Sequence, residues 1–219
     1  MDDLAIIVPC YNEEQTIGLV IEDLQTYLPQ AEIYVYNNNS TDRTVDIAHL
    51  YDVHVRNCVK QGKGNVVQAA FQEVDAKNYL ILDGDYTSFA SDAHKLLEQL
   101  KLGADMVVGD RLSAYEKDGN RARAIGNMLF SKLVKLIHRH ISDDPLSGYR
   151  AFSRNFVQHV ALESEGFTIE IEMEIKSKPF KVVSVPVQYR DRPEGSKSKL
   201  KAFSDGRKII WYALTHRKG

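Results

Sequence analysis

The sequence predicts an α/β protein with a mainly parallel sheet flanked by helices, followed by a smaller C-terminal region. Short apolar runs alternate with amphipathic stretches through the first 111 residues, at the spacing of right-handed βαβ units. Polar side chains follow several of these runs directly, as expected where parallel strands end at the binding edge of an open sheet. After Arg111 the alternation stops and a polar segment follows.

Five strands are predicted before Arg111. The run Leu4–Val8 is apolar and is closed by Pro9, and Tyr79–Leu82 has the continuous apolar character of a buried parallel strand. The other three predicted strands are Glu32–Tyr36, Val53–Val55 and Met106–Val108.

Helices are predicted between these strands, because apolar residues recur there at helical spacing. Asn12 is expected to cap the first helix, with acidic residues in its first turn. Ser40 or Thr41 is expected to cap the second helix and Ser91 the fourth. The stretch Gly62–Asn65 leads into the third.

The chain after Arg111 has a less regular pattern. Met128–Ile137 is predicted as a helix, and Lys181–Arg190 as a strand. Residues 205–216 form a short amphipathic helix that suits either a membrane surface or core packing. Phe167–Ile175 is ambiguous, because its alternation favours a strand whereas its Glu and Met residues favour a helix.

Composition limits the function classes. Hydrophobic residues make up 43% and charged residues 26%, as in a globular protein, and the net charge of -2 argues against nucleic acid as the main partner. From Lys176 onward, however, twelve Lys or Arg face three Asp or Glu. This basic end suits a phosphate-bearing partner or an anionic membrane, although a solvated basic face has the same composition.

The sequence favours a cytoplasmic location, with peripheral contact to the inner face of a membrane as one option. The two cysteines, Cys10 and Cys58, suggest neither a disulfide framework nor a zinc site. The N-terminus is acidic and enters a strand at once, unlike a signal peptide. No apolar stretch approaches the ~20 residues of a membrane span.

Two aspartates follow the predicted strand Tyr79–Leu82 directly. Asp83 and Asp85 are separated by one glycine, so both carboxylates can turn toward one cation. Mg²⁺ and Mn²⁺ prefer oxygen ligands and commonly bridge carboxylates to substrate phosphates. Asp-Gly-Asp is also common in turns, so the rest of the chain must decide between a metal site and a simple turn.

Other polar residues follow neighbouring strands and should line the same edge. They are Tyr11, Asn12, Glu13, Asn37, Asn38, Asn39, Asp42 and Arg111. An aromatic ring, amides, carboxylates and an arginine together suit a nucleotide diphosphate with a divalent ion. The glycine-rich fingerprints of dinucleotide-binding and P-loop proteins are absent from the sequence, as is the nucleophile elbow of α/β-hydrolases.

Seven segments in order resemble the family-2 glycosyltransferases of the GT-A fold, in particular the dolichyl-phosphate or polyprenyl-phosphate sugar transferases. The segments are IIVPCYNEE, NNNSTDRT, QGKGNVVQAAF, LILDGDYTS, MVVGDRL, DDPLSGYRAF and YRDRPEGSKSKL. The resemblance covers the chain from Leu4 to about Gly206.

The resemblance implies a Rossmann-like, nucleotide-binding sheet and a domain organisation. Residues 1–206 would form the GT-A domain, with 1–111 as the nucleotide-sugar half and 112–206 as the acceptor half. Residues 207–219 would form the amphipathic C-terminal helix. The resemblance also implies that Phe167–Ile175 is helical.

The resemblance further implies a set of donor-binding residues. They are Pro9, Tyr11, Glu13, Asn37, Asp83, Gly84, Asp85, Thr87, Arg111, Arg192 and Lys199. Asp83 and Asp85 would hold Mg²⁺ or Mn²⁺, and Arg192 and Lys199 would close over the donor diphosphate. Asn37 begins an Asn-Asn-Asn-Ser run where the family usually has Asp-Asp-Gly-Ser, which leaves the nucleotide base open.

The implied reaction is an inverting hexosyl transfer from a UDP- or GDP-linked sugar to a polyprenyl phosphate, with Asp85 and Arg111 as catalytic residues. A phosphate acceptor is already anionic near neutral pH and needs no strong base. The candidates for holding that phosphate are Arg111, Arg121, Arg123 and Arg150.

Two alternatives remain open. Transfer to a saccharide hydroxyl would need a carboxylate base, for which Asp144 is the candidate, although it is equally a turn residue before Pro145. A non-catalytic nucleotide-binding module would explain the asparagine run. His138 and His140 are expected to mark an exposed helix end rather than a metal site.

Overall fold

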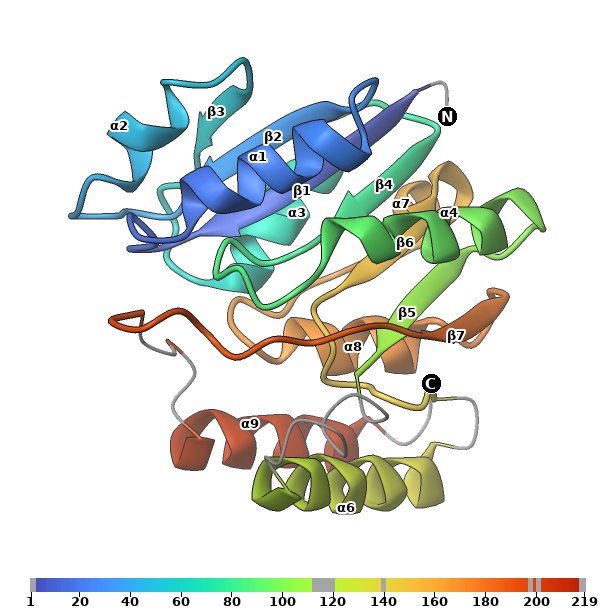
Figure 1. Ribbon diagram of the computed structural model, residues 1–219. Helices are drawn as coiled ribbons and strands as arrows, with labels where there is room; N and C mark the ends of the chain where they lie inside the picture. The colour runs from blue at the N-terminus through green and yellow to red at the C-terminus, as the bar shows by residue number, and fades with distance from the viewer. Residues whose placement is uncertain (1–2, 112–120, 139–140, 197–198, 200–201, 217–219) are drawn as a thin grey trace.

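Figure 1 shows a central sheet with helices on both faces and two further helices beyond one edge. The structure, a computed structural model, describes residues 3–111, 121–138, 141–196, 199 and 202–216, with the side chains of 121–127 and 202–204 left out. The strands are β1 (Leu4–Cys10), β2 (Glu32–Asn37), β3 (His54–Asn57), β4 (Asn78–Ile81), β5 (Met106–Asp110), β6 (Arg150–Ser153) and β7 (Val182–Pro186). The helices are α1 (Ile17–Tyr27), α2 (Thr44–Ala48), α3 (Lys63–Glu73), α4 (Ala93–Lys101), α6 (Arg121–Ile137), α7 (Arg154–His159), α8 (Ile169–Lys176) and α9 (Ala202–Thr215), with a 3₁₀ turn at Ala90–Asp92.

Within the described residues, the strands form one sheet in the order β3-β2-β1-β4-β6-β5-β7. Strand β6 is antiparallel to both β4 and β5, and the other neighbouring pairs are parallel. The prediction of a mainly parallel sheet is therefore confirmed. Because β4 and β5 point the same way on either side of β6, Asp83 and Arg111 lie at the same edge of the sheet.

Both faces of the sheet are covered by helices (Figure 1). Along β1, Leu4, Ile6 and Val8 contribute to the apolar cluster that includes residues of α1 and α4. The alternate residues Ala5 and Ile7 contribute to the cluster that includes residues of α3, α7 and α8. A strand buried on both faces is apolar at every position, which explains its continuous hydrophobic run.

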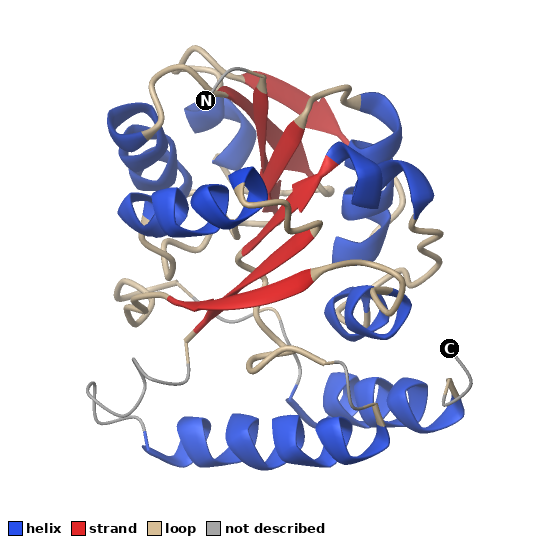
Figure 2. Cartoon of the chain, turned by 90° about the vertical axis from the view of Figure 1, so that its right-hand side faces the viewer, coloured by secondary structure: helices blue, strands red, loops and turns tan. Residues whose placement is uncertain are grey.

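Helices α6 and α9 lie side by side beyond β7 and form a further layer (Figure 2). Val134 of α6 and Ile209 and Ala213 of α9 share a small apolar cluster with Ile171 and Ile175 of α8. Among the described residues, no helix combines the length and apolar character needed to cross a bilayer.

The ambiguous segment Phe167–Ile175 contributes helix α8. Every residue from Ile169 to Ile175 is buried. Three alternating glutamates each bind a cation: Glu170 binds Lys63, Glu172 binds Lys176, and Glu174 binds Arg150. The alternation therefore reflects buried ion pairs around a helix and not the two faces of a strand, and the helix implied by the family resemblance is confirmed.

The predicted helix caps were wrong. Thr16 caps α1, which has no acidic residue in its first turn, while Asn12 lies in the preceding loop with a positive φ of 54°. Arg43 and Asp92 occupy the cap positions of α2 and α4 instead of the predicted serines and threonine. The polar residues after β1 and β2 hydrogen-bond to each other, so they are not available to the helix ends.

Several boundaries after Arg111 also differ from the prediction. Helix α6 begins at Arg121 and not at Met128, α7 was not predicted, and β7 ends at Pro186. Helix α9 begins at Ala202, so the boundary expected between 206 and 207 falls inside a helix.

Candidate active site

The turn Asp83-Gly84-Asp85 follows β4 and packs closely against the end of β1. A Cβ atom on Gly84 would lie 2.6 Å from the Cys10 sulfur, so only glycine fits without a shift. The Gly84 N–H donates to the Pro9 carbonyl at 3.4 Å, and the Thr16 hydroxyl donates to the Gly84 carbonyl at 2.7 Å. The turn is thereby fixed between β1 and the start of α1.

Asp83 is paired with a buried lysine. The Lys63 ammonium, at the start of α3, lies 2.5 Å from Asp83 and 2.8 Å from Glu170. Burial lowers the pKa of Lys63, but the two carboxylates outweigh burial and raise that pKa well above its ordinary value. Burial raises the pKa of Asp83, but the attraction of Lys63 outweighs it and lowers that pKa. Asp83 is therefore held as a carboxylate.

Asp85 is buried and oriented by two partners. The Thr87 hydroxyl and backbone N–H donate to one carboxylate oxygen, at 2.7 and 3.0 Å. The guanidinium of Arg192 binds the other oxygen. Three predicted site residues that are up to 107 positions apart in the sequence are thus brought together.

The segment that carries Arg192 and Lys199 lies over the end of β1. Both cations are 3.6 Å from the Glu13 carboxylate, and the Lys199 ammonium also donates to the Asn12 carbonyl at 2.8 Å. Burial raises the pKa of Glu13, and Lys199 and Arg192 oppose that shift. Both predicted diphosphate ligands therefore lie against Glu13, and Arg192 also binds Asp85.

The loops after β1 and β2 are joined by reciprocal hydrogen bonds. The Asn12 N–H donates to the Ser40 hydroxyl at 3.0 Å, and the Thr41 N–H donates to the Asn12 side-chain oxygen at 2.7 Å. The Glu13 N–H donates to the Thr44 hydroxyl at 2.8 Å. This network holds the backbone on either side of Tyr11 and Glu13 in place.

Asn37, the last residue of β2, and the next residue, Asn38, face different surroundings. Asn38 is buried, and its amide binds the carbonyls of Cys58 and Lys60 and accepts from the Gly62 N–H. It therefore fixes the loop into α3 and does not face a ligand. Asn37 is half-buried at the sheet edge, where its amide donates to the Asn57 side chain at 2.9 Å.

Arg111 and Asp144 form a bidentate pair at the end of β5. The Arg111 Nε and Nη2 atoms donate to the two Asp144 oxygens at 2.7 and 3.1 Å. Asp144 is fully buried, and both of its oxygens are engaged. This position does not suit the predicted general base, because the carboxylate is turned toward Arg111 and away from solvent. Asp144 instead orients Arg111.

The other predicted phosphate ligands differ in outcome. Arg150 is fully buried and donates to the Ser147 and Pro145 carbonyls and to Glu174, so it belongs to the core and does not line the site. The side chains of Arg121 and Arg123 lie outside the described residues, as does His140. His138 is buried, contrary to expectation.

The family model for glycosyl transferase family 2 matches residues 5–161, which include the β4 carboxylates, Arg111 and Asp144. The chain belongs to the family 2 glycosyltransferases.

Two curated relatives align with nearly the whole of this glycosyltransferase. Glycosyltransferase AglJ of Haloferax volcanii is 37% identical over 220 residues, which cover 99% of this chain and 72% of that protein. The dolichyl-phosphate hexose transferase of the same organism is 30% identical over 209 residues, which cover 95% and 91% of the two chains.

The fold of this glycosyltransferase is also found among solved structures. Glucosyl-3-phosphoglycerate synthase from Mycobacterium tuberculosis, in complex with Mn²⁺, UDP and phosphoglyceric acid, gives a TM-score of 0.81 at 20% identity. The match covers 98% of this chain and 78% of that chain. The predicted GT-A fold is therefore confirmed.

Three residues of the glycosyltransferase site were missed by sequence reasoning. Lys63 lies in the QGKGN segment, which was interpreted only as the start of a helix, and Glu170 lies in the ambiguous segment. Gly148 precedes β6, and a Cβ atom there would lie 2.6 Å from the Lys63 ammonium and 2.7 Å from Asp83. The position of Lys63 in one of the seven family-like segments is a sequence signal for a role in the site. Nothing in the sequence indicates that Asp83 and Glu170 are its partners.

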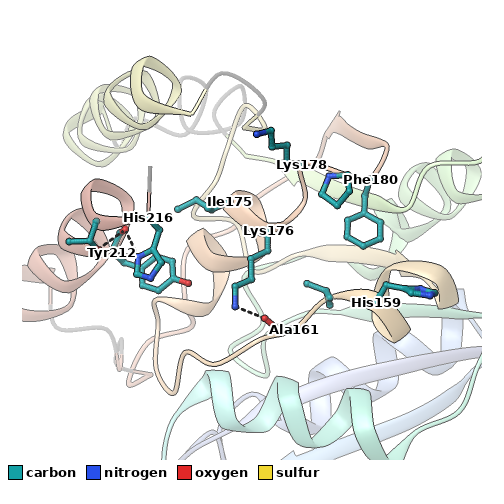
Figure 3. A pocket seen from close by; sticks show the side chains of 11 residues that line it. His159, Ala161, Ile175, Lys176, Lys178, Phe180, Tyr212 and His216 are labelled. Carbon is teal, nitrogen blue, oxygen red and sulfur yellow. Dashed lines mark hydrogen bonds between the residues drawn. The ribbon is translucent and has the colours of Figure 1, made fainter. Parts of the chain in front are cut away.

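A cavity of about 530 Å³ lies elsewhere on the glycosyltransferase, between the ends of α7, α8 and α9 (Figure 3). Lys176, which lines it, binds Glu172 at 2.8 Å and the Ala161 carbonyl. The Tyr212 and His216 rings stack on one another at 3.9 Å. None of the predicted site residues lines this cavity, so it is separate from the site at the sheet edge.

Proposed function

We propose that this glycosyltransferase transfers a hexose from a nucleotide diphosphate sugar to a polyprenyl phosphate, with a divalent cation and with inversion at the anomeric carbon. The observation that carries the proposal is the pairing of the site carboxylates. Asp83, Asp85, Glu13 and Asp144 each lie against a Lys or Arg. A site in which these four acids are neutralised suits an acceptor that is already ionised.

The donor set fits a divalent cation that takes part of its coordination from the substrate. Among the described residues, no three His, Cys, Asp or Glu side chains are gathered to hold a metal by themselves. Asp83 and Asp85 would hold Mg²⁺ or Mn²⁺, with diphosphate oxygens completing the shell. When bound, the cation stabilises the charge that develops on the departing nucleoside diphosphate. The relative crystallised with Mn²⁺ and UDP supports this assignment.

Arg192 and Lys199 would bind the same diphosphate. Both follow β7 in the sequence, and both contact Glu13. Charge-assisted hydrogen bonds from these groups strengthen as negative charge moves to the leaving group. Tyr11, Pro9 and Asn37, at the ends of β1 and β2, would hold the ribose and the base.

On the acceptor side, Arg111 would bind the acceptor phosphate. Its bidentate pair with Asp144 fixes the direction of the guanidinium. The fixed positive charge would then align the acceptor phosphate. Residues 1–111 would then be the nucleotide-sugar half and 112–206 the acceptor half. The related dolichyl-phosphate hexose transferase supports a lipid phosphate acceptor.

The first test is calorimetric titration of the protein with UDP and with GDP, with and without Mn²⁺. We expect metal-dependent binding of one nucleotide, and at least a tenfold weaker affinity in Asp85→Asn, because a metal ligand is weakened. The exposed Asp46→Asn variant is the matched control and should bind as the wild type does. Failure of both nucleotides to bind to the folded wild type would contradict the donor site, whereas nucleotide binding without transfer to any acceptor would favour the non-catalytic module.

The acceptor is tested next, with the sugar derivatives of the preferred nucleotide. Transfer to a polyprenyl phosphate, with an inverted anomeric configuration of the product by NMR, supports the proposal. Transfer only to a saccharide or to a small phosphorylated acid would overturn the acceptor assignment and leave the donor site intact.

A further inference from the structure

Helix α6 carries its leucines on the outside. Leu129, Leu133 and Leu136 are 59%, 43% and 82% exposed, and their spacing places them on one face. The opposite face buries Ser131 and His138 against the protein. Val134 is also buried on the inner face, so α6 is apolar toward the protein and toward solvent, whereas a surface helix ordinarily keeps its solvent side polar.

Helix α9 repeats the arrangement. Ile209 and Ala213 are buried, whereas Trp211 is 69% exposed and Ile210 and Leu214 are each 38% exposed. Trp211 is the only tryptophan of the chain. Exposure of so large an apolar side chain, next to two further apolar ones, indicates that water is not the natural neighbour of this face.

The two helices present these residues on the same side of the molecule. The His138 ring at the end of α6 is hydrogen-bonded to the Ala213 carbonyl of α9 at 2.8 Å, and both helices pack their inner faces on α8. Figures 1 and 2 agree that α6 and α9 lie side by side at the end of the molecule farthest from α1. We call their outward surface the α6/α9 face; its exposed apolar residues are Met128, Leu129, Leu133, Leu136, Ile210, Trp211 and Leu214.

The α6/α9 face concentrates exposed apolar side chains and also carries basic ones. Among the described residues it holds seven of the thirteen exposed large hydrophobic side chains. The described exposed cations of these helices include Lys132, Arg207 and Lys208, while Lys135 of α6 is paired with Asp143 at 2.5 Å. Two copies meeting through this face would bring like charges together, whereas anionic lipid head groups would neutralise them.

We propose that the α6/α9 face binds the surface of an anionic lipid bilayer. Leucines and a tryptophan enter the head-group region, where tryptophan is favoured, and the flanking lysines and arginines contact lipid phosphates. Helix α6 follows Arg111 after residues 112–120, and α9 follows Lys199 after residues 200–201. The proposal deepens the proposed function, since a bilayer-bound face would bring the site to the level at which a polyprenyl phosphate is presented.

The test uses the full chain and vesicles made of equal parts phosphatidylcholine and phosphatidylglycerol. We expect co-sedimentation with these vesicles, a blue shift of Trp211 fluorescence on binding, and weaker binding to pure phosphatidylcholine. Leu136→Glu should lower the partition coefficient about tenfold or more, because a charge replaces a leucine that would enter the bilayer. Leu50→Glu is the matched control, since Leu50 is 78% exposed but lies beyond α2, and it should bind as the wild type does.

Two results would overturn the proposal. The first is a wild-type protein that binds neither kind of vesicle. The second is a stable dimer, by light scattering, that Leu136→Glu dissociates without any effect on vesicle binding; the face would then be a protein interface. Nucleotide titration of Leu136→Glu separates this proposal from the proposed function, because the variant should keep wild-type nucleotide affinity.

Discussion

The chain before Arg111 and the chain after it are stabilised in different ways. Before Arg111, strands buried on both faces pack against α1, α3 and α4 in two large apolar clusters. After Arg111, β6, α7 and α8 add to these clusters, a further small cluster joins α6, α8 and α9, and buried ion pairs are present as well, such as Arg150 with Glu174. Apolar packing of this kind leaves a periodic pattern in the sequence, whereas the Arg150–Glu174 pair joins residues 24 positions apart that no pattern links.

The largest expected effect comes from breaking the Arg150–Glu174 pair. Arg150→Met should lower the free energy of unfolding by about 3–5 kcal/mol, because Glu174 would remain buried without its cation. Urea denaturation followed by circular dichroism measures this loss. The control is Arg154→Met, since Arg154 is 39% exposed and its pair with Asp75 lies at the surface, where loss of a pair costs about 1 kcal/mol or less. If the two variants lost the same free energy of unfolding, the buried Arg150–Glu174 pair would contribute no more to stability than a surface pair.

A smaller effect is expected on catalysis, and it tests whether Arg111 belongs to the donor side or the acceptor side of the site. Arg111→Ala should lower the transfer rate by about 10²–10³, the usual cost of removing one aligned electrostatic donor, and should leave nucleotide affinity unchanged. Rate assays and calorimetry on the same preparation measure both quantities. If nucleotide affinity fell as far as the rate, Arg111 would belong to the donor side and the division at this residue would be misplaced.

The smallest expected effect depends on pH. Burial raises the pKa of Glu172, but hydrogen bonds from Lys176, Ser164 and Glu163 outweigh it, so that pKa is lowered. The stabilisation is therefore complete above the unfolded pKa of about 4.3 and is lost as pH falls through the lower folded pKa. Glu172→Gln should cost about 1.5–3 kcal/mol at neutral pH.

That cost should shrink as the solution is acidified, because the wild type then loses the same charge. Urea midpoints measured from neutral to acidic pH follow the change. Glu98→Gln, at an exposed position of α4, should give a curve parallel to the wild type. A Glu172→Gln curve that also stayed parallel would show that ionised Glu172 contributes nothing to folding.

The same division decides what the sequence could predict. The strands before Arg111 and the convergence of Asp83, Asp85 and Arg111 at one edge follow from periodicity and the rules of parallel sheets. The partners of those residues could not be predicted in this way, because Lys63 contacts Asp83 from the start of α3 and Asp144 contacts Arg111 from a later loop. The misplaced cap at Asn12 has a similar cause, since a neighbouring loop took up its side chain.

The antiparallel strand β6 separates the strand that precedes the aspartates, β4, from the strand that precedes Arg111, β5. It lies between β4 and β5, so the ends that carry the aspartates and Arg111 are two strand spacings apart, roughly 10 Å. Gly148, at its entrance, has no side chain to fill that gap beside Asp83. The distance between the ends of β4 and β5 is thus set by the backbone pairing of the sheet, so side-chain substitutions in the loops should leave it unchanged.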